Sequence, residues 1–270
     1  MNSKKIGFIG AGSMGQAIIK GFIETKAADR EDIIAFARSE MTRELLKKNL
    51  AIKTAASNQE VVKEAEVIFL AVKPQVLPQV LNELKGCFST DKLVVSIAAG
   101  VTLAKLEGLL GSGIPVIRVM PNTPCLVQAG ASAFSLGTWA KEEDGKWLQR
   151  MLQALGCAVL VPEKLMDAVT GLSGSGPAYV YLAVEALADG GVREGLSRKD
   201  ALLLAAQTVM GAAKMVLETG EHPGALKDKV TSPGGTTIEG VRVLEESGFR
   251  SALMNAVIAA SSKSQELGGN

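Results

Sequence analysis

Apolar residues occur in short runs through residues 1–162, and segments with a helical repeat of apolar positions separate these runs. The runs are rich in Val and Ile and end at Gly, Pro or polar residues, a pattern typical of buried strands. We expect strands at residues 5–10, 32–37, 67–72, 93–99, 115–120, 132–136 and 157–162. Because these strands alternate with helices, the pattern predicts a parallel sheet covered by helices on both faces.

The pattern changes after Pro162, beyond which only the helical repeat continues. Helices are predicted at residues 163–171, 176–191, 198–219, 222–229, 236–246 and 249–266. The sequence therefore predicts an α/β fold, with a Rossmann-type domain at 1–162 and an all-α domain at 163–270. The apolar segment 202–217 is too short to span a bilayer, so we expect a buried helix there, as at a dimer interface. The polar tail from residue 263 is expected to fray.

Composition and charge exclude several classes of protein. Hydrophobic residues make up 47% of the chain, which indicates that some apolar surface is buried between subunits. The net charge of +1, with no basic run, disfavours nucleic-acid binding. Cys87, Cys125 and Cys157 are scattered, which predicts neither a disulfide framework nor a metal site and fits the reducing cytoplasm.

A glycine-rich loop follows the first predicted strand and precedes a helix, in the sequence GFIGAGSMG. Gly10, Gly12 and Gly15 have the spacing G-x-G-x-x-G. The first glycine permits the tight turn, the second lets a pyrophosphate approach the backbone, and the third lets the helix pack on the strand. The pyrophosphate then lies at the helix N-terminus. The loop, with Ala11, Ser13 and Met14, therefore predicts a dinucleotide site.

The end of the second predicted strand distinguishes NADP from NAD. NAD sites usually carry an acidic residue there, which binds the ribose hydroxyls. This strand instead ends in Ala37, Arg38 and Ser39, and Glu40 is expected to open the next helix. Arg38 can face a 2′-phosphate and Ser39 can donate to it. NADPH is therefore the expected cofactor; NADH is the alternative, in which Arg38 is only a solvated charge.

Loops at the carboxyl ends of further strands are expected to line the same site, because ligands bind there in open parallel sheets. Lys73 ends a buried strand just before a proline, where it either contacts a ribose or phosphate or caps the next helix. Asn122, in the sequence PNTP, is suited to a contact near the nicotinamide ring. The predicted contacts in these loops are Ala71, Val72, Lys73, Pro74, Ala98, Ala99, Gly100 and Asn122.

Side chains for acid–base catalysis are scarce. The only histidine, His222, precedes Pro223 at a predicted helix start, which favours a structural role. Hydride transfer from a nicotinamide to an electrophilic carbon needs little proton transfer from side chains and fits this repertoire. The Gly- and Ser-rich segment 170–177 is interpreted as a close helix contact or a hinge.

A second glycine-containing loop, TSPGGTT at residues 231–237, precedes a predicted helix. Free amides at a helix N-terminus and the helix dipole favour a carboxylate. An ordinary N-cap is the alternative, but a single capping residue would suffice for that. Two glycines and the nearby hydroxyls exceed this need, so the loop is interpreted as a ligand site.

These motifs resemble those of the pyrroline-5-carboxylate reductase family from end to end. They are GFIGAGSMG, FLAVKP, SIAAGV, MPNTP, AVTGLSGSGPAY, ALADGGV, HPGALKDKVTSPGGTTIEG and GFRSALMNAV. The segment from Ser232 to Gly240 is specific to the family, whereas many dehydrogenases share the G-x-G-x-x-G loop. The resemblance implies reduction of L-1-pyrroline-5-carboxylate to L-proline with NADPH or NADH, the last step of proline synthesis. It also implies a homodimer through the helical domain, with dimers assembling into decamers.

The resemblance further implies roles for particular residues. Ser232 and the backbone amides of Gly235 and Thr236 would hold the substrate carboxylate, with Gly234 in the same loop. The Thr237 hydroxyl would lie near the ring nitrogen and act in catalysis. Glu163 is expected near the substrate. Asn58, Lys73 and the Ala98–Gly100 loop are expected at the cofactor.

Three other functions remain open on the sequence alone. A β-hydroxyacid dehydrogenase shares the two-domain plan but usually places a catalytic lysine in the helical domain, and no lysine here lies in a matching motif. A catalytically silent NADP sensor would not need the loop at 231–237. A relative that reduces another cyclic imine acid would differ only in packing around the ring.

Overall fold

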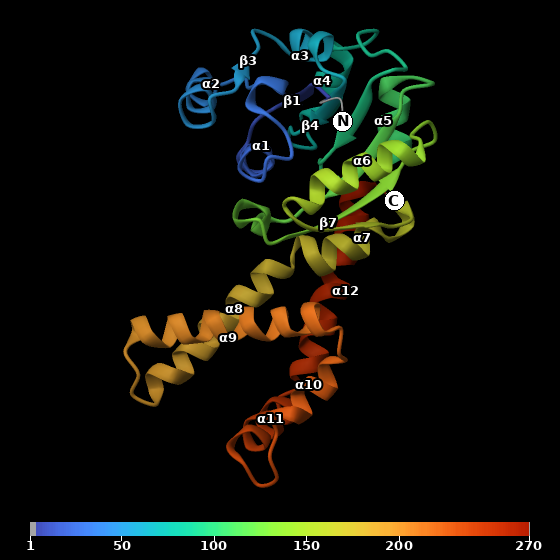
Figure 1. Ribbon diagram of the computed structural model, residues 1–270. Coiled ribbons are helices and arrows are strands. Elements are labelled where there is room, and N and C mark those ends of the chain that lie inside the picture. The colour runs from blue at the N-terminus through green and yellow to red at the C-terminus, as the bar shows by residue number, and fades with distance from the viewer. Residues whose placement is uncertain (1–3, 270) are drawn as a thin grey trace. The chain divides into compact units, whose positions relative to one another are not determined.

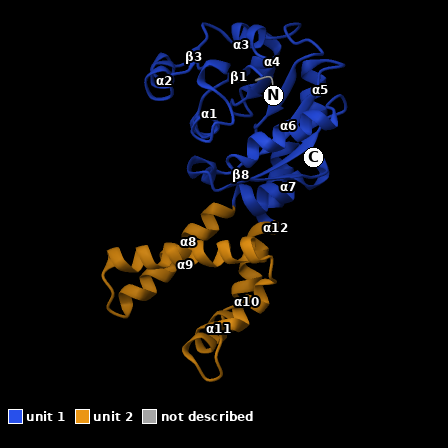
Figure 2. Cartoon of the chain, in the orientation of Figure 1, with its two compact units in different colours: residues 1–175, 259–270 blue, residues 176–258 orange. Residues whose placement is uncertain are grey.

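The structure, a computed structural model, describes residues 4–269 (Figure 1). Its contacts divide the chain into two compact units (Figure 2). Unit 1 extends through Ser175 and resumes at Ala259, and unit 2 is Gly176–Ile258. These limits follow contacts alone, so the functional boundary expected after residue 162 stays a prediction.

Unit 1 contains an eight-stranded sheet in the order β3-β2-β1-β4-β5-β6-β7-β8. The strands are β1 (Ile6–Ile9), β2 (Ile33–Phe36), β3 (Lys53–Thr54), β4 (Val67–Leu70), β5 (Leu93–Ser96), β6 (Val116–Met120), β7 (Gly130–Leu136) and β8 (Gly156–Leu160). All seven predicted strands are present. The sequence missed β3, because its two residues are polar and form no apolar run.

Neighbouring strands are parallel except β6 and β7. The connection between these two strands, residues 121–129, is shorter than the crossover that a parallel pair needs. The chain therefore turns back directly and pairs antiparallel, with Arg118 opposite Ser135. The predicted parallel sheet is confirmed with this one exception.

Helices cover both faces of the sheet, as predicted. They are α1 (Ser13–Glu24), α2 (Glu40–Leu45), α3 (Asn58–Glu64), α4 (Leu77–Glu83), α5 (Leu103–Leu110), α6 (Glu142–Gln153) and α7 (Met166–Val169). One apolar cluster joins the sheet to α1 and α6, and the other joins it to α3, α4 and α5. In the first cluster Phe8 stacks on Phe69 at 4.8 Å, and Phe22 of α1 meets Phe69 edge-on at 5.9 Å.

The strand order reverses between β1 and β4. From β1 the chain builds toward β2 and β3, and from β4 it builds toward β5 and β6. In open α/β sheets, ligands bind beyond the carboxyl ends of the strands at such a switch point. The glycine-rich loop after β1 and the loop from Ala71 to Pro74 after β4 both begin there.

Unit 2 is entirely helical within the described chain. It contains α8 (Gly176–Arg193), α9 (Arg198–Thr219), α10 (Pro223–Lys229), α11 (Thr236–Glu246) and the first part of α12 (Phe249–Gly268). These helices match the predicted ranges closely. A five-residue π-helix, Thr170–Gly174, precedes α8 in the segment interpreted from the sequence as a close helix contact or a hinge. A side chain at Gly174 would lie 2.6 Å from the Met120 methyl group of β6, so the chain packs closely there against a strand; the expected helix contact or hinge stays a prediction.

Two expectations about the helical part have different outcomes. The apolar segment of α9 is exposed in the single chain, with Leu203 66% and Leu217 80% accessible, so its burial at a dimer interface stays a prediction. Helix α9 packs on α8 around Ala188, Ala201 and Ala205. Of the described helices, α9 has the length and apolarity to cross a membrane, with 11% of its apolar window buried. The expected fraying is wrong for residues 263–268, since α12 extends to Gly268 and the buried Ser264 donates to Asp167 at 2.6 Å.

Candidate active site

A cavity of about 320 Å³ lies at the switch point of the sheet. It brings together loops that follow β1, β2 and β4, which are distant in sequence. The residues that line it are Gly10, Ala11, Gly12, Phe36, Ala37, Arg38, Ser39, Thr42, Asn58, Ala71, Val72, Lys73, Val76 and Val80. Most of the predicted cofactor contacts therefore share one cavity.

The three glycines of the loop after β1 occupy distinct environments. Gly10 has a φ of +86°, and a side chain there would come within 2.8 Å of the Ala71 carbonyl oxygen. Gly15 is close-packed, with its missing Cβ 3.2 Å from the Ala71 methyl group. Gly12 has no heavy atom within 4 Å of that position, so the space beside its backbone is open. This geometry matches the turn, the ligand approach and the helix contact expected of the motif.

The first turn of α1 offers unused donors to this open space. Gly12 is the N-cap residue, and no side chain of the described chain caps the helix. The first amides of a helix lack acceptors within it, and the helix dipole makes this end electropositive. Among these residues, Ser13 and Met14 begin the helix. The arrangement is suited to a pyrophosphate.

Two arginines lie near the turn between β2 and α2, Arg38 in the turn and Arg43 in α2, and they differ in their contacts. Arg43 donates from Nη1 to the carbonyl oxygens of Ala37 (2.6 Å) and Arg38 (3.0 Å), which fixes the turn into α2. Arg38 is exposed and lines the cavity. Ser39 is the N-cap of α2, and its Oγ accepts the Thr42 amide at 3.4 Å. A positive charge thus borders the cavity where NAD sites carry an acid.

Asn58 and Lys73 complete the polar lining. The Asn58 Oδ1 atom is buried and has no hydrogen-bond partner within residues 4–269. A buried acceptor without a partner costs free energy, so a donor from a ligand would offset that cost. The Lys73 carbonyl accepts the amides of Val76 and Leu77, so its backbone caps the following turn while its exposed side chain borders the cavity.

Several predicted cofactor residues lie outside this cavity. Pro74 follows β4 and the Ala98–Gly100 loop follows β5, but none of these residues lines the cavity. Asn122 is 8% exposed and already bonded: its Nδ2 donates to the Ser173 carbonyl at 3.1 Å, and its Oδ1 accepts the Ala131 amide at 2.9 Å. These bonds tie the loop after β6 to the π-helix and β7. Cofactor contact by these residues stays a prediction.

Sequence reasoning missed part of the apolar lining of the cavity. Phe36 and Ala37 close it at the end of β2, and Val76 and Val80 close it one helical turn apart at the start of α4. The four-residue spacing of Val76 and Val80, just after the Lys73-Pro74 turn, could have placed both valines on one helix face toward the cavity. No sequence signal could have placed Thr42 there, because its position depends on the turn that Arg43 fixes.

The second glycine-containing loop lies in unit 2, before α11. Gly234 has a φ of +65°, and Gly235 is the N-cap residue with no side-chain cap in the described chain. The Gly235 amide donates to the Ser232 carbonyl at 3.1 Å, which closes the turn. The Gly235 amide is therefore occupied, while Thr236 and Thr237 begin the helix with exposed side chains. The ordinary cap is thus disfavoured, and the helix end remains open to an anion.

The remaining candidate acid–base groups have structural roles. His222 is the N-cap of α10, and its Nδ1 accepts the Gly224 amide at 3.1 Å, in line with the role expected from the sequence. Burial raises the pKa of the Cys125 thiol, so this group stays protonated and poorly nucleophilic near neutral pH. Neither group lines the cavity at the switch point.

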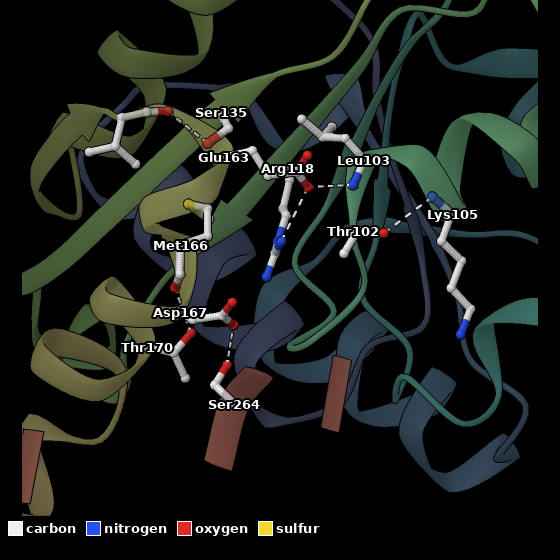
Figure 3. Close-up of polar contacts among 11 residues, drawn as sticks. Thr102, Leu103, Lys105, Arg118, Ser135, Glu163, Met166, Asp167, Thr170 and Ser264 are labelled. Atoms are coloured by element: carbon white, nitrogen blue, oxygen red, sulfur yellow. Dashed lines mark hydrogen bonds and ion pairs between the residues drawn. The ribbon is translucent and has the colours of Figure 1, made fainter. Parts of the chain in front are cut away.

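Glu163 begins a 3-10 turn after β8 and lies against α5 and β6 (Figure 3). Its Oε1 accepts the Leu103 amide at 2.5 Å and lies 3.2 Å from Nη1 of Arg118. The expected contact of Glu163 with substrate stays a prediction, and its observed partners belong to unit 1.

Family models match both parts of the chain. Residues 163–267 match the model described as pyrroline-5-carboxylate reductase dimerisation. Residues 5–100 match the model described as NADP oxidoreductase, coenzyme F420-dependent. The first match covers the helices after β8, and the second covers the glycine-rich loop and the cavity.

Whole-chain relatives agree with these matches. A pyrroline-5-carboxylate reductase of Methanosarcina acetivorans is 53% identical over 268 residues and 99% of each chain. That of Escherichia coli is 48% identical over 98% of each chain. A solved pyrroline carboxylate reductase of Plasmodium falciparum with NADP bound has a TM-score of 0.89 at 37% identity, over 99% of each chain. The chain therefore belongs to the pyrroline-5-carboxylate reductase family.

Proposed function

We propose that this protein reduces L-1-pyrroline-5-carboxylate to L-proline with a nicotinamide cofactor, as the last step of proline synthesis. One observation carries the proposal. The chain is about half identical, from end to end, to relatives named for this activity, and the aligned length includes both glycine-containing loops.

NADPH is the proposed cofactor, and NADH is the alternative. Arg38 supports this choice, because it lies exposed at the cavity where a 2′-phosphate would meet a positive charge. The Plasmodium falciparum relative was solved with NADP. The orphaned Asn58 oxygen and the open space beside Gly12 fit a dinucleotide in the cavity. Pro74, Ala98, Ala99, Gly100 and Asn122 are proposed to contact it farther along.

The proposed substrate site is the loop from Ser232 to Thr237. The substrate carboxylate would accept hydrogen bonds from the Ser232 hydroxyl and from free amides at the start of α11. Because the Gly235 amide is used in the turn, the Thr236 and Thr237 amides carry more of this role than the sequence suggested. Gly234 supplies the left-handed turn that aims them.

The proposed mechanism assigns positioning to the protein. When bound, the nicotinamide supplies a hydride to C5 of the cyclic imine, and the C5–N double bond becomes a single bond. The loop at residues 232–237 orients the ring through its carboxylate, and the Thr237 hydroxyl orients the ring nitrogen. A threonine is too weak an acid to protonate that nitrogen unaided, so the proton comes from solvent or from substrate that is already protonated.

The proposed assembly is a homodimer formed by the helical part, with a nucleotide-binding domain at 1–162 and a substrate-binding and dimerisation domain at 163–270. The match of residues 163–267 to a dimerisation model, together with the exposed apolar face of α9, supports a dimer. Further assembly into a decamer and a location in the cytoplasm are proposed from the resemblance to the family.

Steady-state oxidation of NADPH tests this function. Three substrates are compared in parallel: pyrroline-5-carboxylate, piperideine-6-carboxylate and a β-hydroxy acid. The two imines are assayed with NADPH and the hydroxy acid with NADP⁺. All three assays are then repeated with NADH or NAD⁺. We expect the highest kcat/KM for pyrroline-5-carboxylate with NADPH. Preference for the six-membered ring, oxidation of the hydroxy acid, or cofactor binding without turnover would each replace the proposal with one of the alternatives.

A further inference from the structure

Arg118 carries its charge inside the sheet of unit 1. It lies on β6 between Ser96 of β5 and Ser135 of β7 and is 5% exposed. A guanidinium stays protonated in proteins, and burying it without a partner is costly. Within residues 4–269 its ion-pair partner is Glu163, whose Oε1 lies 3.2 Å from Nη1 (Figure 3).

The same carboxylate oxygen reaches a second element. It accepts the backbone N–H of Leu103 at 2.5 Å, and Leu103 is the first residue of α5. That N–H has no acceptor inside its own helix, and a carboxylate at this end also interacts favourably with the helix dipole. One oxygen of Glu163 therefore joins β6, the start of α5 and the turn after β8.

The start of α5 determines the position of the loop that precedes it. Residues 97–102 connect β5 to α5 and contain the Ala98–Gly100 segment proposed to contact the cofactor. The connection is short, so a shift of Leu103 is transmitted to this segment. Gly100 has a φ of +73°, and a Cβ at Gly268 of α12 would lie 3.3 Å from its carbonyl oxygen, so the loop also packs closely against the C-terminal helix.

We propose that Glu163 and Arg118 are positioning residues, which hold the β5–α5 loop in the conformation that receives the nicotinamide cofactor. Glu163 acts through the Leu103 amide and does not contact the substrate, in contrast to the expectation from family resemblance. Arg118 acts by fixing the Glu163 carboxylate. This inference rests on the proposed function, because contact between the loop and the cofactor is part of that function.

The Glu163→Gln variant tests the proposal. Glutamine keeps an oxygen that can accept the Leu103 amide but loses the charge that holds Arg118. We expect the Kd for NADPH, measured by fluorescence titration, and the KM for NADPH to rise about 5- to 20-fold. The KM for pyrroline-5-carboxylate and the kcat at saturating NADPH should change less than about two-fold, since the substrate loop is untouched.

Three further variants separate positioning from simple loss of stability. Arg118→Lys keeps a charge near Glu163 and should retain NADPH affinity better than Arg118→Met. The double variant Glu163→Gln/Arg118→Met removes both charges, and its loss of NADPH affinity should not exceed that of the larger single loss. If Glu163→Gln fails to fold in a thermal unfolding scan, the comparison of Arg118→Lys with Arg118→Met tests the positioning role instead.

Glu107→Gln is the matched control. Glu107 lies later in α5, and its carboxylate accepts the Thr138 amide at 2.6 Å and its hydroxyl at 3.0 Å. It anchors the same helix but not the end that follows the loop. We expect its NADPH affinity to match the unaltered protein.

Two outcomes overturn the proposal. One is a KM for pyrroline-5-carboxylate that rises more than about ten-fold in Glu163→Gln while the Kd for NADPH is unchanged, which would show direct substrate contact. The other is NADPH affinity that is unchanged in Glu163→Gln, or lowered equally in the control. If the unaltered protein binds NADPH but does not reduce the imine, the proposed function fails while the titration still tests the positioning role.

Discussion

In the turn between β2 and α2, some side chains stabilise the backbone and another borders the cavity. Arg43 bonds two carbonyl oxygens and sits over the Phe36 ring at 5.7 Å, so its charge shapes the turn. Ser39 caps α2. Arg38 has neither task and faces the cavity, which leaves its guanidinium for a phosphate. The choice between NADPH and NADH is therefore proposed to depend on the Arg38 side chain.

Replacing Arg38 with alanine should therefore weaken NADPH more than NADH. A charge-assisted hydrogen bond contributes about 1.5–3 kcal/mol, which corresponds to roughly a 10- to 100-fold rise in KM for NADPH. The KM for NADH in the same variant is the internal control and should change less than about three-fold. Equal losses for both cofactors would place Arg38 away from the 2′-phosphate.

Thr237 carries the proposed contact with the reacting nitrogen. Thr237→Ala should lower kcat by about 10- to 100-fold, because an oriented hydrogen bond to the reacting group is lost, with little effect on the Kd for NADPH. Thr237→Ser keeps the hydroxyl and should recover most of the activity. Unchanged kinetics in the alanine variant would remove the assigned role.

At the scale of elements, helices α1 and α11 share the same kind of N-terminus. Each begins after a glycine N-cap with no side-chain cap in the described residues, and each follows a glycine with positive φ. An uncapped helix N-terminus presents amides to an anion. The first is proposed for a diphosphate and the second for a carboxylate.

The glycine-rich loop allows ligand binding to be separated from folding. Gly12→Ala adds a methyl group where no atom lies within 4 Å, so the protein without cofactor should unfold at the same temperature. The methyl would occupy the space proposed for the pyrophosphate, so the rise in Tm that NADPH gives should be lost. Gly108→Ala is the control, because Gly108 lies within α5 and is equally open. Its free energy of unfolding should rise by about 0.5–1 kcal/mol, and NADPH should still raise its Tm. A normal NADPH-induced rise in Gly12→Ala would place the pyrophosphate elsewhere.

Sequence patterns predicted the elements well where burial was strong and local. Runs such as Val67–Leu70 are apolar throughout and read directly as buried strands. The edge strand β3 and the π-helix at Thr170–Gly174 were not predicted, because neither has a distinctive apolar period. Residues that line the cavity were predictable where the glycine spacing of the motif places them, as at Gly10 and Gly12. The bonds of Glu163 and Asn122 were not, since they join residues far apart in the chain.

At the scale of the molecule, the described residues of unit 2 form a small apolar core of little volume. Its buried hydrophobic residues are Ala188, Ala201 and Ala205, whereas leucines along α9 are exposed. Alanines bury little apolar area, so they stabilise a helical unit weakly. Large exposed apolar faces mark interaction surfaces. The match of this region to a dimerisation model fits that expectation.

Leu203→Asp should therefore disrupt the dimer. A charge at this 66% exposed position would be buried without a partner in the assembled protein. We expect sedimentation velocity to show a monomer, with a lowered Tm. Leu203→Met keeps the apolar surface and should remain dimeric. A dimeric Leu203→Asp protein would place the interface on another face.

The loop at residues 232–237 is proposed to bind the carboxylate of a five-membered imine for hydride transfer. The ratio of kcat/KM for pyrroline-5-carboxylate to that for 1-pyrroline, which lacks the carboxylate, measures this directly in the unaltered protein and in Ser232→Ala. We predict that the ratio falls about ten-fold or more in the variant, because the loop then contributes less to the carboxylate while the reduction of 1-pyrroline is unaffected. An identical ratio in both proteins would contradict the account.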